Sequence, residues 1–257
     1  MARVFITGSS DGLGLKAAQL LVEQGDSVVL HARNQQRADE TQKTLPEAEA
    51  IVVGDLASIA QTRHVADQVN QLGTFDAVIH NAGIGYREPR RIVTEDRLSH
   101  LLAVNTIAPY ILTALIARPK RLVYLSSGLH QDGDPSLSDL TWAERPWRGQ
   151  KAYSDTKFHD VLLAFAVARR WPGVLSNALE PGWVPTKMGG PGAPDDMDQA
   201  HRTQVWLAVS DDPAASVSGE YFYHMQKRRP LPATRDISTQ DRLLDFCSRA
   251  TGVELPL

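Results

Sequence analysis

The 257-residue sequence has little of several features that would assign a protein to a special class. It contains one cysteine, Cys247, so no disulfide can form within the chain, which suits a reducing compartment. No apolar run approaches the roughly 20 residues that a membrane-spanning helix needs, and the N-terminus does not have the pattern of a signal peptide. The formal net charge of −3 gives no electrostatic reason to expect nucleic acid or an anionic membrane as a partner. These absences predict a soluble cytoplasmic protein.

Short runs rich in Val, Ile and Leu alternate with helical patterns along most of the chain. The expected strands cover 3–6, 27–31, 50–53, 77–80, 121–125 and 175–179, and the two longest expected helices cover 95–117 and 152–170. Strands of this composition that are separated by helices predict a doubly wound parallel β-sheet flanked by helices, an α/β fold. No composition change marks a boundary, so residues 1–257 are expected to form a single domain. The Gly- and Pro-rich stretch 185–198 predicts a flexible flap.

Between the first expected strand and the first helix lies the loop TGSSDGLG, residues 7–14. Glycines let the backbone approach a pyrophosphate, and N–H groups at the start of the next helix point toward it. The loop therefore predicts a dinucleotide site, although a tight turn without a ligand remains an alternative. Asp11 puts a negative charge into this loop. We interpret it as a helix cap that is turned away from the ligand.

Further motifs follow in the order found in the short-chain dehydrogenase/reductase superfamily, which the sequence resembles. After TGSSDGLG come Asp55-Leu56, Asn81-Ala82-Gly83, Ser126-Ser127, Tyr153-x3-Lys157 and Pro181-Gly182-x3-Thr186. The resemblance covers about residues 3–190 and implies a Rossmann-type fold. The long interval between the serine pair and the tyrosine is similar to that of the retinol-dehydrogenase-like branch, which carries an insertion there.

The resemblance implies a nicotinamide cofactor. Its implied contacts are Gly8, Ser10, Asp11, Gly12, Leu13, Gly14, Arg33, Asn34, Asp55, Leu56, Asn81, Ala82, Gly83, Tyr153, Lys157, Pro181, Gly182, Val184 and Thr186. In this superfamily an acidic residue after the second strand binds the ribose of NAD, whereas a basic one accommodates the extra phosphate of NADP. Ala32 stands at the acidic position and Arg33 follows it, so NADP(H) is expected. Many NADP-dependent relatives have a basic residue where Asp11 stands, so NAD(H) stays possible. A solvated Arg33 that only begins a surface helix is the alternative.

Tyr153 and Lys157 are four residues apart, hence on one face of a helix. A tyrosine that acts as acid and base near neutral pH needs its pKa, about 10 in water, lowered by roughly 2 to 3 units. A nearby ammonium group can supply this. The resemblance implies that Lys157 also holds the nicotinamide ribose and that Ser127, rather than Ser126, bonds the substrate oxygen. The alternative for the serines is that both merely end a strand.

Asn105 is a polar residue on an otherwise apolar helical stripe. Pro109 has no N–H and cannot bond the carbonyl of Asn105 four residues earlier, so this carbonyl is expected to be free to hold a water. The resemblance implies that this water continues a proton relay from Lys157. The alternative is a buried asparagine that satisfies its own kinked helix.

Taken together, the motifs predict an NADP(H)-dependent oxidoreductase that interconverts a carbonyl and an alcohol by hydride transfer. The alternatives are a catalytically silent NADP(H) sensor and an epimerase or dehydratase. A homodimer or homotetramer is compatible with the resemblance, with the helices 95–117 and 152–170 as its interface. No metal site is expected, because His80, His130 and His159 lack ligand spacing. Three tryptophans, Trp142, Trp147 and Trp183, either line an apolar substrate pocket or cover the core.

Overall fold

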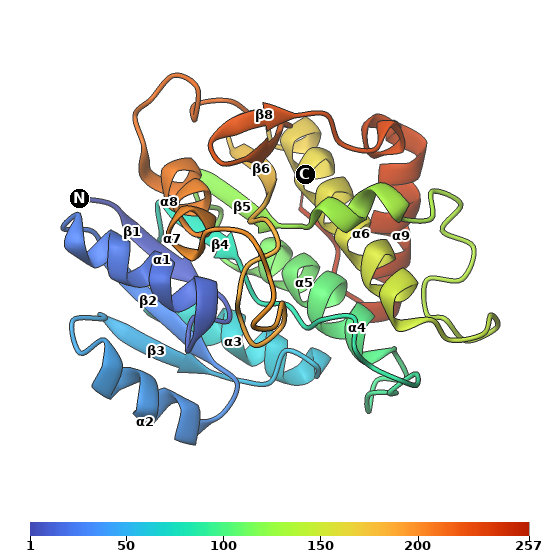
Figure 1. Cartoon of the computed structure of the whole chain (residues 1–257), viewed down its shortest axis with the longest axis horizontal. Coiled ribbons are helices and arrows are strands. Elements are labelled where there is room, and N and C mark those ends of the chain that lie inside the picture. Colours follow the sequence, from blue (N-terminus) through green and yellow to red (C-terminus); the bar gives the residue numbers. More distant parts are fainter. Residues whose placement is uncertain (257) are drawn as a thin grey trace.

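The β-branched runs form one eight-stranded sheet in the computed structural model, which describes residues 1–256 (Figure 1). The strands are β1 (Arg3–Ile6), β2 (Ser27–Ala32), β3 (Ala50–Val53), β4 (Ala77–His80), β5 (Arg121–Leu125), β6 (Leu175–Glu180), β7 (Tyr221–Tyr223) and β8 (Gln226–Arg228). Their order is β3-β2-β1-β4-β5-β6-β7-β8, and only β8 runs antiparallel to its neighbour. The chain winds outward from the centre in both directions, which confirms the predicted Rossmann-type arrangement. The last two strands were not predicted, because each has only three residues.

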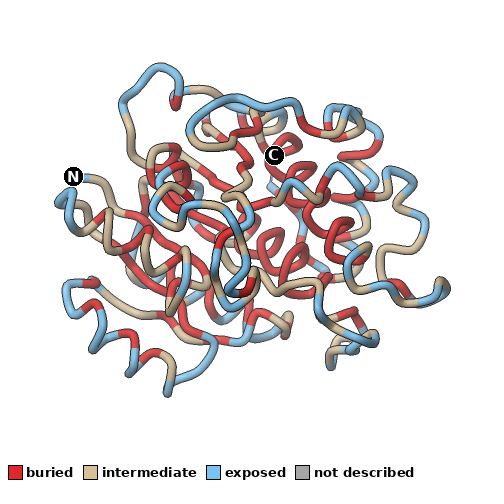
Figure 2. The backbone as a smooth tube through the Cα atoms, in the orientation of Figure 1, coloured by how far each residue is buried: buried red, intermediate tan, exposed pale blue. Residues whose placement is uncertain are grey.

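Helices cover both faces of the sheet. They are α1 (Gly12–Glu23), α2 (Gln35–Thr44), α3 (Ile59–Gln71), α4 (His100–Leu102), the π-helix η1 (Ala103–Ile107), α5 (Ala108–Leu115), the 3-10 helix η2 (Gly128–Asp132), α6 (Gly149–Arg170), α7 (Met197–Ala200), α8 (Arg202–Val209), the 3-10 helix η3 (Pro232–Arg235) and α9 (Ile237–Thr251). Successive residues of a strand point to opposite faces. Phe5 therefore packs with the cluster of α3, α5, α6 and α9, whereas Val4 and Ile6 pack with α1 and α8. Figure 2 shows the buried backbone concentrated in the strands, α5 and α6.

The predicted helix 95–117 is shorter and less regular than expected. It begins at His100 and ends at Leu115. Ser99 caps its start, because the Ser99 hydroxyl accepts a hydrogen bond from Leu102 N at 3.4 Å. Its five residues Ala103–Ile107 are π-helical. This widening directly precedes Pro109, which cannot supply the N–H that an α-helix would use at that turn.

The predicted subunit interface is not supported by burial. All residues of α5 from Ala108 to Ala114 are buried within the chain, and so are those of α6 from Ala152 to Val167. The helix α6 is covered by η2 and α9 (Figure 1). A homodimer or homotetramer would have to use other surfaces, because these helices offer no free apolar face.

The flap 185–198 packs against the rest of the chain. Gly189 accepts hydrogen bonds through its carbonyl from the Trp183 indole at 3.1 Å and from Arg87 at 3.3 Å. The turn is closed by a bond from Gly189 N to the Thr186 hydroxyl at 3.1 Å. Its flexibility stays a prediction. None of the helices between residues 1 and 256 has the length and apolar character that crossing a membrane requires.

Candidate active site

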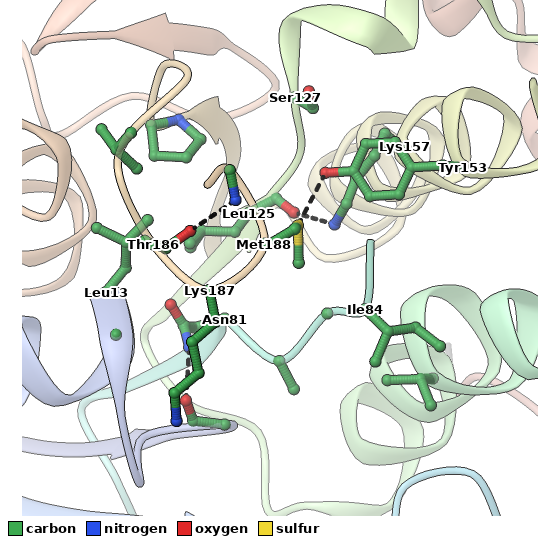
Figure 3. A pocket seen from close by; sticks show the side chains of 18 of the residues that line it. Leu13, Asn81, Ile84, Leu125, Ser127, Tyr153, Lys157, Thr186, Lys187 and Met188 are labelled. Atoms are coloured by element: carbon green, nitrogen blue, oxygen red, sulfur yellow. Dashed lines mark hydrogen bonds between the residues drawn. The ribbon is translucent and has the colours of Figure 1, made fainter. Parts of the chain in front are cut away.

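A cavity of about 1120 Å³ opens at the carboxyl ends of the strands, where the loops after β1 to β6 meet (Figure 3). Most of the predicted site residues line it. They are Gly8, Ser10, Asp11, Gly12, Leu13, Arg33, Asp55, Leu56, Asn81, Ala82, Gly83, Ser127, Tyr153, Lys157, Pro181, Gly182, Val184 and Thr186. Residues that are up to 178 positions apart in the sequence thus share one cavity, because parallel strands bring their carboxyl ends to the same edge.

Three predicted site residues do not line this cavity, and each has another contact. A Cβ atom on Gly14 would lie 2.4 Å from Asn81 Nδ2, so this glycine allows α1 to pack closely on the loop after β4. The Asn34 side chain caps α2 by accepting a hydrogen bond from Arg37 N at 3.0 Å. Asn105 is buried, and its side chain bonds the loop after β4.

The glycine loop has the shape of a phosphate cradle. Gly8 has a φ of +62°, and a Cβ there would lie 2.7 Å from Ala82 Cα, so only glycine fits. Gly12 also has a positive φ, +56°, and no atom lies within 4 Å of the place where its Cβ would be. The backbone is therefore accessible from the cavity at Gly12. This open, glycine-lined start of α1 fits the pyrophosphate of a dinucleotide.

His31, which the sequence did not single out, fixes the base of this loop. The Gly8 N–H donates to His31 Nδ1 at 3.0 Å, so the other ring nitrogen, Nε2, carries the proton and donates to Gly54 O at 2.8 Å. Burial lowers the pKa of His31, which keeps the ring neutral and suits this pattern. In the sequence, only the position of His31 at the end of the second strand could have indicated that it contacts the glycine loop.

Asp11 behaves differently from the expected helix cap. It occupies the N-cap position of α1, but its side chain makes no capping hydrogen bond. The carboxylate instead pairs with Arg37 at 2.6 Å and with Lys187 of the flap at 2.7 Å. Burial opposes the charge, but Lys187 and Arg37 outweigh it and hold the pKa of Asp11 below its usual value. The mistaken capping role has a simple cause, since two cations bind a carboxylate more strongly than one N–H does.

Arg37 and Lys187 were also missed, and both line the cavity together with Arg33. Arg37 lies four residues beyond Arg33, close to the start of α2, and this spacing could have suggested a shared position. No sequence pattern links Lys187 to Asp11, because the flap reaches the loop only in the folded chain. Arg37 and Lys187 thus pair with the Asp11 carboxylate, and Arg33 lines the same cavity.

Tyr153 and Lys157 project from α6 at the other end of the cavity (Figure 3). The Tyr153 hydroxyl contacts Met188 Sδ of the flap at 3.8 Å. Lys157 Nζ lies 5.8 Å from the centre of the tyrosine ring. It donates to Leu125 O at 2.7 Å and to Asp160 Oδ2 at 2.8 Å. Asp160 was not identified from the sequence, although it lies three residues beyond the lysine on the same helix.

The ionisation of Tyr153 differs from the sequence-based expectation. Burial raises the pKa of Tyr153, and Lys157 together with a hydrogen bond to Ser127 lowers it, with a net rise. Burial works to lower the pKa of Lys157, but Asp160 and Tyr153 raise it above its usual value. The lysine is therefore charged, yet it alone does not bring the phenol into the neutral range.

The two serines after β5 have different surroundings. The Ser126 hydroxyl is buried and donates to Lys157 O at 2.7 Å, which ties β5 to α6. Ser127 is less buried and lines the cavity, and its Oγ accepts a hydrogen bond from Leu129 N at 3.3 Å. Ser127, and not Ser126, is a hydrogen-bond partner that lowers the pKa of Tyr153, and its contact with substrate stays a prediction.

The Asn105 side chain connects two parts of the site. Its Oδ1 accepts from Ile84 N at 2.8 Å, and its Nδ2 donates to Ile84 O at 3.1 Å and to Thr156 Oγ1 at 3.0 Å. The side chain thus binds a neighbouring loop and α6, rather than satisfying its own helix. The proposed water on its carbonyl stays a prediction.

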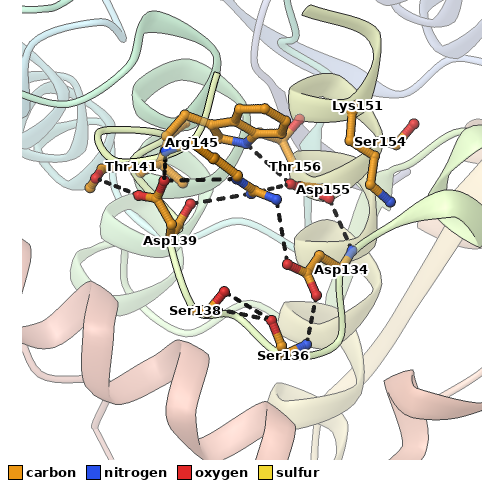
Figure 4. A network of polar contacts seen from close by, with 12 residues as sticks. Asp134, Ser136, Ser138, Asp139, Thr141, Arg145, Lys151, Ser154, Asp155 and Thr156 are labelled. Atoms are coloured by element: carbon orange, nitrogen blue, oxygen red, sulfur yellow. Dashed lines mark hydrogen bonds and ion pairs between the residues drawn. The ribbon is translucent and has the colours of Figure 1, made fainter. Parts of the chain in front are cut away.

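The segment between Ser127 and Tyr153 is pinned to α6 by a charged network (Figure 4). Arg145 pairs with Asp155 at 2.6 Å and with Asp134 at 3.4 Å. The Trp142 indole donates to Asp155 at 3.1 Å, below the Arg145 guanidinium. Trp142 is buried and, like Trp147, does not line the cavity, so both cover a core cluster that includes Tyr153.

Trp183 alone of these three tryptophans lines the cavity. The histidines are bonded to protein groups: His80 to Thr113, His130 to Ser127 O and His159 to Thr106. Within residues 1–256, no group of three or more His, Cys, Asp or Glu residues could hold a metal ion.

Comparisons with known proteins agree with this geometry. Residues 2–129 match the family model described as short chain dehydrogenase. An uncharacterized oxidoreductase of Emericella nidulans is 46% identical over 260 residues, which cover 100% of this chain and 99% of the relative. Human retinol dehydrogenase 13 is 29% identical over 288 residues, covering 98% and 85% of the two chains, in line with the predicted resemblance.

Solved structures share the same fold. A protein of Mycobacterium paratuberculosis superimposes with a TM-score of 0.82 at 25% identity, covering 100% of this chain and 96% of the other. A gluconate 5-dehydrogenase of Burkholderia cenocepacia, in complex with NADP and tartrate, gives 0.66 at 22% identity over 92% and 96% of the chains. The chain belongs to the short-chain dehydrogenase/reductase family of oxidoreductases.

Proposed function

We propose that the protein is an NADP(H)-dependent oxidoreductase that interconverts a carbonyl and an alcohol. The observation that carries the proposal is one continuous cavity, with the glycine cradle at one end and Tyr153, Lys157 and Ser127 at the other. Binding of a dinucleotide alone would not require all three of these side chains. Their arrangement therefore favours catalysis over a silent sensor.

The bound cofactor supplies hydride to the carbonyl carbon or accepts it in the reverse direction. Tyr153 donates its hydroxyl proton to the carbonyl oxygen during reduction and takes the proton back during oxidation. Ser127 orients that oxygen by a hydrogen bond. Lys157 holds the nicotinamide ribose, and it favours the tyrosinate that remains after proton transfer.

The remaining predicted contacts divide along the cavity. Asn81, Ala82 and Gly83 serve the adenosine ribose, and Asp55 serves the adenine. The turn at Pro181–Val184 and Thr186 serve the nicotinamide end. Met188 contacts the Tyr153 hydroxyl, so this flap residue borders the place where a substrate oxygen would meet the tyrosine.

Preference for NADP(H) rests on charge. Arg33, Arg37 and Lys187 all line the cavity, and a 2′-phosphate suits such a group of cations. Asp11 offsets part of this positive charge, which reduces the preference for NADPH. NADH is therefore expected to bind, but more weakly than NADPH. The fold neighbour in complex with NADP is consistent with this choice.

The test combines binding and turnover. Thermal shift and nicotinamide fluorescence titrations should show NADPH binding, and a panel of carbonyl compounds with NADPH should reveal a substrate. Tyr153→Phe should still bind NADPH but lose activity by a factor of about 10² to 10⁴, the usual size of general acid catalysis. Binding of neither cofactor would refute the proposal. Binding with no turnover, and no difference between wild type and Tyr153→Phe, would instead identify a sensor.

A further inference from the structure

Asp160 is a buried carboxylate whose only hydrogen-bond partner in residues 1–256 is the lysine of the site. Its Oδ2 lies 2.8 Å from Lys157 Nζ, and the two side chains are each 5% exposed. Tyr153, Lys157 and Asp160 occupy positions i, i+4 and i+7 of α6, which lie on one face of a helix. The ammonium group thus has a phenol on one side and a carboxylate on the other.

This position opposes what the lysine does for the tyrosine. A lone buried ammonium group favours tyrosinate and lowers the energy of the deprotonated phenol. A carboxylate in contact with that ammonium cancels much of its charge at a distance. Seven residues of helix place Asp160 about 10 Å from Tyr153 along the axis, and at this range a unit charge in a protein shifts an ionisation by about one pKa unit.

We propose that Asp160 is a positioning residue that pairs with Lys157 and, by offsetting the lysine's charge, keeps the Tyr153 hydroxyl protonated further into the alkaline range. Reduction needs the protonated phenol, whereas oxidation of the alcohol needs the tyrosinate. The carboxylate therefore extends reduction to higher pH and moves the onset of oxidation to higher pH by the same amount. This inference rests on the proposed function, because it sets the pH dependence of the same reaction.

The ionisable surroundings support this reading. Besides Lys157 and Tyr153 of α6, the groups that interact with the charge of Asp160 are Tyr124 of β5 and Tyr221 of β7. Burial raises the pKa of Asp160 by more than Lys157 lowers it, so the pKa lies above its usual value, at about 6. The carboxylate is therefore charged at neutral pH. Tyr86 and Asp160 both add to the rise in the pKa of Tyr153. Burial also raises the pKa of Tyr124 and Tyr221 well above the usual value, which keeps their titration apart from that of Tyr153.

The test is a tyrosinate titration by ultraviolet difference absorption, with the Tyr153→Phe spectrum subtracted at each pH. It needs neither cofactor nor substrate. In the wild type the Tyr153 signal should appear at higher pH than that of an unperturbed tyrosine, whose pKa is about 10, whereas a signal clearly below that of an unperturbed tyrosine would overturn the proposal. Asp160→Asn, which keeps the size of the side chain and loses its charge, should move the signal down by about one pH unit. Asp160→Glu should restore it.

Activity gives a second readout once a substrate is found. With Asp160→Asn, the alkaline fall of kcat in reduction and the alkaline rise of kcat in oxidation should both move to lower pH by the same amount. A folded Asp160→Asn protein with unchanged titration and unchanged profiles would show that the carboxylate only supports the fold. If this variant does not fold, the wild-type titration alone decides. Failure of NADPH binding would refute the proposed function but leave the tyrosinate result intact.

Discussion

The two ends of the cavity each hold an aspartate–lysine pair, and the two pairs differ in burial. At the end with Tyr153, Lys157 and Asp160 are both 5% exposed and lie on one helix. At the end with the glycine loop, the side chains of Lys187 and Asp11 are 82% and 47% exposed, and they come from the flap and that loop. The distances are nearly the same, 2.8 and 2.7 Å.

Burial decides what each pair can do. Water screens the exposed pair, so the pair contributes at most about 1 kcal/mol to the free energy of unfolding. Lys187 can therefore leave Asp11 and bind a ligand phosphate at little cost. The buried pair cannot exchange its partners cheaply, because an uncompensated charge inside the protein is costly. The same pair of residue types therefore gives an adaptable contact at the glycine loop and a fixed one beside Tyr153.

The largest difference between the pairs should appear when each lysine is removed. Lys157→Met leaves Asp160 buried without a partner, and it should lower the free energy of unfolding by about 3 to 5 kcal/mol. Lys187→Met should lower it by less than about 1 kcal/mol. Chemical denaturation at neutral pH measures both, and Lys157→Met combined with Asp160→Asn should recover part of the loss. If Lys157→Met and Lys187→Met lowered the free energy of unfolding equally, burial would not explain the difference between the two pairs.

The two carboxylates should also affect stability with opposite signs as the pH changes. The folded pKa of Asp160 is raised to about 6, so the folded state binds more protons than the unfolded state between about pH 4 and 6. Its contribution should become less favourable by about 3 kcal/mol as the pH rises through that window. The folded pKa of Asp11 is lowered, so its contribution is present above the unfolded pKa and is lost as the pH falls through the folded one. Because water screens this pair, the contribution of Asp11 to the free energy of unfolding should stay below about 1 kcal/mol.

Unfolding free energies from pH 3 to 7 for the wild type, Asp160→Asn and Asp11→Asn provide the measurement. The difference between wild type and Asp160→Asn should fall with rising pH. The difference between wild type and Asp11→Asn should rise slightly. A common sign for both carboxylates would contradict the comparison.

The smallest of the expected effects concerns the choice of cofactor. Arg33→Ala and Arg37→Ala should each weaken NADPH binding about tenfold, equal to about 1.4 kcal/mol, and leave NADH binding nearly unchanged. Asp11→Asn is the matched control, since it frees Arg37 and Lys187 and should tighten NADPH binding. Isothermal titration calorimetry with both cofactors measures these changes. Equal losses for NADPH and NADH would show that the arginines do not bind a 2′-phosphate.

Much of the site could be predicted because the motif residues end strands, and parallel strands end at one edge. Gly8, Asn81, Ser127 and Pro181 each follow a strand that hydrophobic pattern identifies, so their meeting follows from the topology. Tyr153 and Lys157 share a helix face by spacing alone. These positions depend on local structure and on the order of the sheet, both of which are written in short stretches of sequence.

Several of the contacts that were missed join segments with no common pattern. Lys187 reaches Asp11 across 176 positions, and the flap lays Met188 on Tyr153. His31 contacts Gly8 because β1 and β2 are adjacent parallel strands that end at the same edge of the sheet. The π-helical stretch at Ala103–Ile107 depends on how the backbone accommodates Pro109 within a packed layer.

The sequence by itself determined the α/β class, the glycine cradle and the Tyr153–Lys157 pair, because hydrophobic period and residue spacing act over a few turns of chain. Only the tertiary structure decided the charge balance at both ends of the cavity. Asp11 meets Lys187 only because folding brings the flap to the glycine loop. Asp160 meets Lys157 on the same helix, but the exclusion of water from that pair depends on the segments that pack around it. Burial then sets the strength of the contact, since the energy of a charge is governed by its surroundings rather than by its place in the sequence.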